Sequence, residues 1–184
     1  MNDSQDYAKN LLRALEFAAE KHRDQRRKGV EASPYINHPI QVAEVLASFG
    51  QVDDQTTLMA AILHDTIEDT DTTKFDLEKL FGKEVAAVVS EVTDDKSLPK
   101  QERKRLQVEH TPHLSDEAKQ IKIADKTCNV RDIGLKPPTD WDETRRREYF
   151  DWAEAVVAGC RGVNKGLEEY FDLCVADSKN RLTK

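Results

Sequence analysis

Cysteine is scarce in this sequence of 184 residues, and its placement excludes two classes of site. Cys128, Cys160 and Cys174 are odd in number, lie far apart and form no CxxC pair. That pattern fits neither a disulfide framework nor a zinc site made of thiolates. We therefore expect reduced thiols, as in a cytoplasmic protein.

Long hydrophobic runs and a targeting segment are also missing. No apolar stretch approaches the ~20 residues that a membrane-spanning helix needs, and the first six residues are polar and acidic, unlike a signal peptide. A net charge of −7 argues against a nucleic-acid-binding protein with a broad basic surface. We expect a cytoplasmic protein that binds neither membrane nor nucleic acid and needs no protein partner, with a homo-oligomer left open.

Glycine and proline are few, with seven and six residues, and no segment shows the alternation of period two that a β-strand requires. Apolar residues recur at helical spacing instead, which predicts an all-α protein. The expected helices cover residues 7–26, 39–48, 55–68, 76–80, 82–93, 100–110, 115–134, 142–161 and 164–176, with loops at 30–33, 94–98 and 136–140. No repeat or linker divides the chain, so we expect residues 1–176 to form a single domain and residues 177–184 a flexible tail.

The segment 58–70 carries the strongest functional pattern. His64, Asp65, Glu68 and Asp69 follow directly after an apolar run, and in one continuous helix they would share a single patch. Acidic side chains this close repel one another by a few tenths of a kcal/mol per pair unless a cation or a proton neutralises them. The pattern indicates a metal site, although a helix cap or a solvated acidic surface would look the same.

Two further positions could supply ligands to such a site. His38 stands just before a proline that can start a helix, and Asp125 lies inside another apolar segment. Taken singly, His38 could be a capping or core histidine, and Asp125 could pair with a neighbouring lysine. Together with His64 and Asp65 they favour a site for one divalent metal ion.

Several longer motifs occur in order over residues 20–155. They are RRK at 26–28, PYINHP at 34–39, HDTIEDT at 64–70, EVTDDK at 91–96, LPK at 98–100, ERKRLQVE at 102–109, ADK at 124–126 and EYF at 148–150. This series resembles the HD superfamily of metal-dependent phosphohydrolases. It is most similar to the hydrolase domain of the RelA/SpoT family, and within it to the stand-alone metazoan branch, the small alarmone hydrolases. The chain is too short for the synthetase domain of the long RelA/SpoT proteins.

The resemblance implies a helical HD-domain fold and hydrolysis of the 3′-pyrophosphate of (p)ppGpp, giving GDP or GTP and pyrophosphate. The implied ligands of one divalent ion are His38, His64, Asp65 and Asp125. This donor set suits Mn²⁺, Zn²⁺, Fe²⁺ or Co²⁺, and the family favours Mn²⁺. Glu68 and Asp69 would be the catalytic acid/base pair. The implied substrate-binding residues are Arg27, which would stack on the purine, Lys28, Tyr35, Asn129, Lys100, Arg145 and Tyr149.

One departure from the family pattern bears on the substrate. Thr127 and Cys128 stand where the family usually has a leucine followed by a histidine or tyrosine, which could loosen the nucleotide pocket or repack the helix. Two alternative functions therefore stay open. One is another nucleotide phosphohydrolase reaction at the same metal, notably removal of the 2′-phosphate of NADPH. The other is a non-catalytic nucleotide sensor, against which the complete set of ligands and acids counts.

Overall fold

The computed structural model describes residues 3–29 and 31–182, and this part of the chain is helical. The helices are α1 (Asp3–Lys21), α2 (Asn37–Ser48), α3 (Gln55–Leu63), α4 (Thr66–Asp69), α5 (Lys74–Phe81), α6 (Lys83–Val92), α7 (Lys100–His110), the 3₁₀ turn η1 (Thr111–His113), α8 (Asp116–Leu135), α9 (Glu143–Ala158) and α10 (Lys165–Leu182). Among the described residues, β pairing is limited to an isolated bridge between Arg26 and Pro34. The all-α prediction is confirmed. None of the described helices has the length and apolarity needed to cross a membrane.

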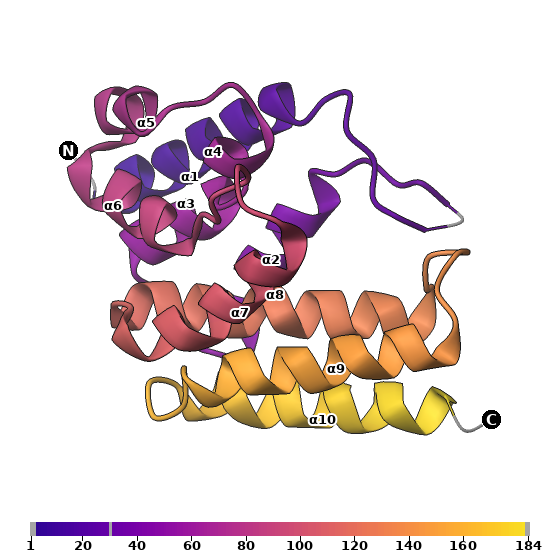
Figure 1. Ribbon diagram of the computed structural model, residues 1–184. Helices are drawn as coiled ribbons and strands as arrows, with labels where there is room; N and C mark the ends of the chain where they lie inside the picture. The colour runs from indigo at the N-terminus through magenta and orange to yellow at the C-terminus, as the bar shows by residue number, and fades with distance from the viewer. Residues whose placement is uncertain (1–2, 30, 183–184) are drawn as a thin grey trace.

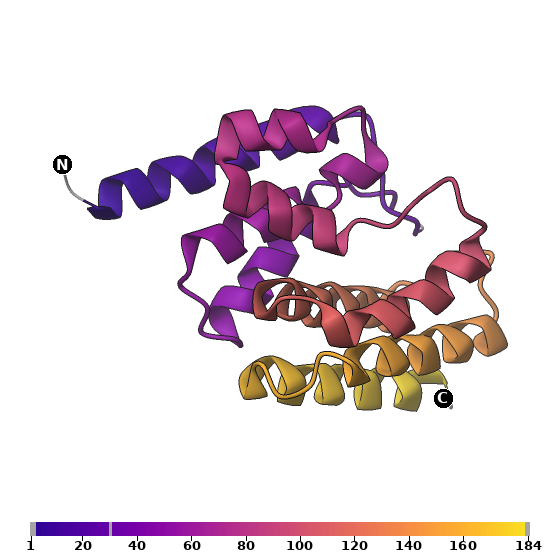
Figure 2. The ribbon, with the colours of Figure 1, turned by 60° about the vertical axis from the view of Figure 1, so that its left-hand side comes forward.

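The helices form two layers, and α8 contacts helices of both. It lies beside α9 and α10 in one layer, while α1, α3, α5 and α6 form the other (Figures 1 and 2). Helix α8 packs against α2, α3 and α6 as well as against α9 and α10. Buried side chains of both layers, from Leu46 and Leu63 to Phe150 and Phe171, form one core, as predicted for a single domain. Residues on α2, α3 and α8 can therefore meet between the layers.

Side-chain caps set the starts of two of these helices. The Asp54 carboxylate accepts a hydrogen bond from the Thr57 N–H at 2.7 Å at the start of α3. The Ser115 hydroxyl accepts one from the Ala118 N–H at 3.2 Å at the start of α8. Each cap satisfies an N–H group that has no partner inside its helix. The caps thereby place the first turns of both helices.

The first helix ends five residues earlier than the predicted boundary at residue 26. After α1 the chain doubles back, because backbone bonds between the two arms of the segment 22–36 replace helical ones. The Arg27 N–H donates to the Ser33 carbonyl at 2.9 Å, and the Tyr35 N–H donates to the Gln25 carbonyl at 3.0 Å. This segment is called the hairpin below. It carries Arg27 to Asn129 and Asp132 on α8, and Tyr35 to Asp65.

The C-terminal segment is also helical as far as it is described. Helix α10 continues to Leu182, both Ser178 and Leu182 are buried, and the Ser178 hydroxyl donates to the Val130 carbonyl at 3.2 Å. The flexible tail predicted over residues 177–184 is therefore wrong for residues 177–182, and residues 183 and 184 lie outside the described part. The prediction failed because Leu182 is an isolated apolar residue among polar ones, too weak a pattern to indicate packing.

We expect Leu182→Ala to lower the free energy of unfolding by about 2 kcal/mol, near the low end for a buried leucine because the site lies at a chain end. The matched control is Leu173→Ala on the same helix, where the side chain is 68% exposed and the expected change is within about 0.5 kcal/mol. Urea denaturation of both variants measures the difference. Equal values for the two variants would contradict the packing of the last turn.

Candidate functional site

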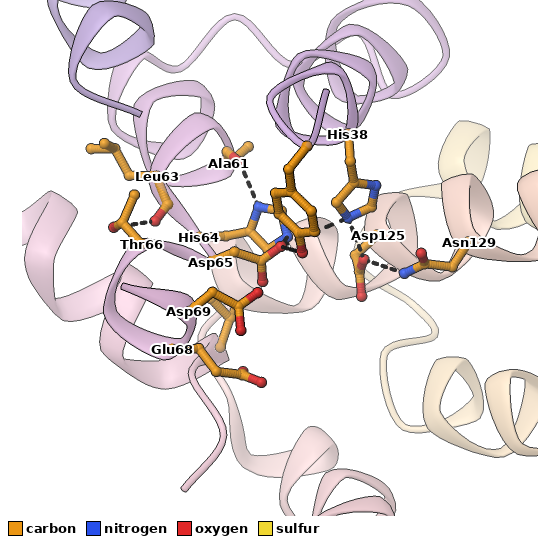
Figure 3. A network of polar contacts seen from close by, with 12 residues as sticks. His38, Ala61, Leu63, His64, Asp65, Thr66, Glu68, Asp69, Asp125 and Asn129 are labelled. Atoms are coloured by element: carbon orange, nitrogen blue, oxygen red, sulfur yellow. Dashed lines mark hydrogen bonds and ion pairs between the residues drawn. The ribbon is translucent and has the colours of Figure 1, made fainter. Parts of the chain in front are cut away.

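A turn between α3 and α4 presents His64 and Asp65. The His64 Nδ1 donates to the Ala61 carbonyl at 2.8 Å, and the Thr66 hydroxyl donates to the Leu63 carbonyl at 2.7 Å (Figure 3). These side chains thus provide partners for two of the carbonyls that the end of a helix leaves free in the buried interior. The continuous helix predicted over 55–68 is therefore wrong, and the turn separates the histidine and its neighbour from the two acids on α4.

The ligand atoms of His38, His64 and Asp65 all lie within 4.8 Å of one another. The His64 Nε2 is 3.0 Å from the Asp65 Oδ2, and the His38 Nε2 is 3.9 Å from the same oxygen. The bond from the His64 Nδ1 to the Ala61 carbonyl directs the other ring nitrogen to this cluster. Two atoms that each lie about 2.1 Å from one ion are roughly 3 Å apart. The three side chains therefore form a candidate metal site.

Asp125 on α8 adjoins this cluster through His38. Its Oδ1 lies 3.1 Å from the His38 Nε2 and accepts a hydrogen bond from the Asn129 Nδ2 at 2.6 Å, while its Oδ2 pairs with the Lys126 ammonium at 2.9 Å. The structure thus brings all four predicted ligands together from α2, the turn and α8 (Figure 3). Both oxygens of Asp125 already have partners, and it is Lys126 rather than Lys122 that pairs with this carboxylate.

Burial and neighbouring charges act in opposite directions on these groups. Burial lowers the pKa of His38. Burial acts in the same direction on His64, but the Asp65 carboxylate outweighs it and the pKa of His64 rises to about 9. Burial alone would raise the pKa of Asp125, yet Lys126 and His38 hold that pKa well below its usual range. A metal ion that binds here would therefore displace the proton from His64.

Glu68 and Asp69 on α4 face the loop after α6. The Glu68 Oε2 accepts a hydrogen bond from the Asp94 N–H at 3.0 Å, and the Arg103 Nη1 lies 3.7 Å from its Oε1. Burial raises the pKa of Glu68. Asp69 is paired with Lys96 instead. The two acids are therefore not equivalent: Glu68 is held by a backbone amide, and Asp69 by a half-exposed ammonium group.

Gln107 is a residue of this site that the sequence did not single out. Its Nε2 donates to the Asp94 Oδ2 at 2.5 Å, and the Asp94 backbone in turn holds Glu68. Helix α7 is thereby linked to the proposed catalytic acid. Gln107 lies in the segment 102–109 and Asp94 in the segment 91–96, and both segments resemble the family. That resemblance is the signal in the sequence that points to this pair.

Two adjoining cavities meet at these side chains. A cavity of about 170 Å³ is bordered by His38, His64, Asp65, Glu68 and Asp125. Beside it lies an open cavity of about 920 Å³, which Glu68 also borders. The predicted substrate-binding residues all border the larger cavity, namely Arg27, Lys28, Tyr35, Lys100, Asn129, Arg145 and Tyr149. Asp69 borders it too. Cations thus gather on this wall in a molecule of net negative charge, which suits a polyphosphate.

Arg27 is held in a fixed orientation at this wall. Its Nη2 donates to the Asn129 Oδ1 at 2.8 Å and to the Asp132 Oδ2 at 2.9 Å, and its guanidinium carbon lies 5.8 Å from the centre of the Tyr35 ring. Asn129 therefore connects Arg27 with the candidate ligand Asp125. Asp132 was not anticipated from the sequence, where it is one acid among many on α8.

Thr127 and Cys128 border neither of these two cavities. Both are buried, and the Thr127 hydroxyl donates to the Ile123 carbonyl at 2.7 Å within α8. Burial raises the pKa of the Cys128 thiol. The departure from the family pattern therefore lies in the buried part of α8 and not at the wall of either cavity.

The fold is that of an HD domain, and the sequence model of the HD domain family matches residues 14–151. Guanosine-3′,5′-bis(diphosphate) 3′-pyrophosphohydrolase MESH1 of Homo sapiens is 56% identical over 162 residues, which cover 88% of this chain and 90% of that protein. MESH1 of Danio rerio is 55% identical over 159 residues, covering 86% of this chain and 88% of that protein. A solved structure, described as a metazoan ortholog of SpoT that hydrolyzes ppGpp and plays a role in starvation responses, superposes with a TM-score of 0.87 at 50% identity, covering 90% of this chain and 93% of that one. The chain therefore belongs to the HD domain family and, within it, to the MESH1 group.

Proposed function

We propose that this chain hydrolyses the 3′-pyrophosphate of (p)ppGpp. Water attacks the phosphorus bound to the ribose 3′ oxygen, the bond between them breaks, and pyrophosphate leaves together with GDP or GTP. The observation that carries the proposal is the cluster of His38, His64 and Asp65 beside a large cavity lined with cations. The activity for which the MESH1 relatives are named supports it.

The proposed metal ligands are His38, His64, Asp65 and Asp125. Their nitrogen and oxygen donors suit Mn²⁺, which the family favours, and also Zn²⁺, Fe²⁺ or Co²⁺. When bound, the ion would polarise the phosphoryl group and favour ionisation of water near neutral pH. Glu68 borders the same small cavity, so we assign to it the orientation of the attacking water and the acceptance of its proton. Asp69 supports this role from the larger cavity.

The larger cavity accommodates the rest of the nucleotide in this proposal. Its volume of about 920 Å³ lies within the usual range of small-molecule sites. The planar Arg27 guanidinium would stack on the base, and Lys28 and Asn129 would contact the nucleoside. Lys100, Arg145 and Tyr149 would bind the phosphates. The cytoplasmic location and the absence of an obligatory protein partner stay predictions.

The test is to supply Mn²⁺ to the purified metal-free protein and to compare its turnover of ppGpp and NADPH, with the products identified by chromatography. Release of pyrophosphate and GDP at a higher kcat/KM than release of phosphate from NADPH is the expected result. A preference for NADPH would replace the proposal with the 2′-phosphatase function, since both substrates carry a phosphate on a secondary ribose hydroxyl. Binding of ppGpp without any turnover would identify a sensor.

We expect Arg27→Ala to weaken ppGpp binding about tenfold or more, because a stacked guanidinium contributes on the order of 1–2 kcal/mol. Metal content should stay normal, since the guanidinium does not belong to the ligand cluster. Calorimetry in a Glu68→Gln background, where turnover is slow, measures the affinity. The matched control is Arg23→Ala, whose exposed side chain pairs with the neighbouring acids Glu20 and Asp24. Unchanged affinity in the Arg27 variant would reject its assignment to the base.

A further inference from the structure

The hydroxyl of Tyr35 is directed at the candidate metal site rather than left free for the nucleotide. It donates to the Asp65 Oδ2 at 2.6 Å. That same oxygen lies 3.0 Å from the His64 Nε2 and 3.9 Å from the His38 Nε2. We propose that Tyr35 is a positioning residue of the metal centre, which holds the Asp65 carboxylate in the orientation needed to bind the ion. The inference rests on the metal site of the proposed function.

The Asp65 Oδ2 can accept the hydrogen bond from Tyr35 and still be a ligand of the ion. A carboxylate oxygen has two lone-pair directions, so the Asp65 Oδ2 can accept from Tyr35 and still face the two histidines. The bond also restricts rotation of the carboxylate about its last torsion, which is otherwise broad. A ligand held in place in this way loses less freedom when the ion binds. Groups that hold metal ligands by hydrogen bonds typically contribute about 10- to 100-fold to metal affinity or activity.

The ring of Tyr35 is itself held from several sides. Its centre lies 4.9 Å from that of His22, a histidine that is 1% exposed and whose Nδ1 lies 2.8 Å from the Gln25 Oε1. It lies 6.0 Å from the centre of the His38 ring in an edge-on arrangement. Tyr35 belongs to the hairpin, whereas Asp65 belongs to the turn between α3 and α4. The hairpin also carries Arg27. The same segment would therefore position the group that binds the base and, through Tyr35, the metal ligand Asp65.

The test compares Tyr35→Phe with wild type, because this change removes only the hydroxyl and keeps the packed ring. Titration of Mn²⁺ into the metal-free proteins by calorimetry should show a 10- to 100-fold weaker affinity in the variant. The Mn²⁺ concentration that gives half-maximal activity should rise by the same factor. At saturating Mn²⁺ the KM for ppGpp should stay within about twofold of wild type, since the hydroxyl is assigned to the metal ligand.

The matched control is Tyr7→Phe, which removes a tyrosine hydroxyl that donates to the Asp53 carbonyl at 3.0 Å and borders neither of the two cavities. Its Mn²⁺ affinity should equal that of wild type. Unchanged Mn²⁺ affinity in Tyr35→Phe, with or without a raised KM, would overturn the proposal. The calorimetric readout does not depend on the substrate. Wild-type protein that binds Mn²⁺ but does not hydrolyse ppGpp would therefore refute the proposed function and leave this inference testable.

Discussion

Glu68→Gln should slow ppGpp hydrolysis by about 10²- to 10⁴-fold while the metal stays bound, the usual loss when general acid/base assistance is removed. The side chain keeps its shape but can no longer accept a proton from the attacking water. Glu68 borders the small cavity with the candidate ligands, yet its own partners are the Asp94 amide and Arg103. Metal content and ppGpp affinity should therefore change little. Single-turnover rates at increasing ppGpp concentration measure the rate and the affinity, and metal analysis measures the bound metal.

Asp69→Asn should slow turnover as well, but by less than Glu68→Gln, because Asp69 borders only the larger of the two cavities and is paired with Lys96. Glu84→Gln, at an exposed position of α6, is the matched control and should leave the rate unchanged. Wild-type rates in both active-site variants would show that the two acids are structural. The mechanism would then be wrong at its central step.

His64→Ala should remove bound metal and activity together. The imidazole supplies a nitrogen that faces Asp65 at 3.0 Å, and its loss leaves a partly buried carboxylate without that partner. We expect metal affinity to fall by more than about 10²-fold, above the range for groups that only hold a ligand in place. Metal analysis after dialysis and ppGpp turnover over a range of Mn²⁺ concentrations measure the two effects.

The control for this variant is His113→Ala, at an exposed histidine of η1 outside the ligand cluster. It should retain metal and turnover. A His64→Ala protein with full metal content and normal turnover would remove the metal site from the mechanism. A variant that unfolds would be recognised by circular dichroism, and His64→Gln, which keeps a polar side chain, would then take its place.

The class of fold and the identity of the candidate ligands could be read from the sequence. Helical spacing of apolar residues reports which faces are buried, and this signal is local, so the order of the helices followed from it. The four candidate ligands stood out because acidic and imidazole side chains inside apolar segments need a partner. The seven predicted substrate-binding residues came from the family resemblance, and all of them border the larger cavity.

The ends of helices at the site could not be read in the same way. The sequence 55–68 has helical spacing throughout, but the chain turns after Leu63 because the side chains of His64 and Thr66 satisfy carbonyls of α3. The hairpin after α1 depends on pairing between its two arms and on the Gln25 side chain, which donates to the Asp69 carbonyl at 2.7 Å. Partners distant in sequence set these features, so local propensity does not report them.

Helical spacing in the sequence thus predicted an all-α protein, and the motifs that resemble the HD family implied an HD domain. Residue type and spacing also indicated His38, His64, Asp65 and Asp125 as candidate ligands, because both are properties of each segment by itself. Tertiary structure alone decided what each side chain contacts. It joined Tyr35 to Asp65, placed Asn129 between Arg27 and Asp125, and separated the environments of Glu68 and Asp69. These contacts depend on how α2, the hairpin and α8 pack together, and the free energy of that packing is shared among residues far apart along the chain.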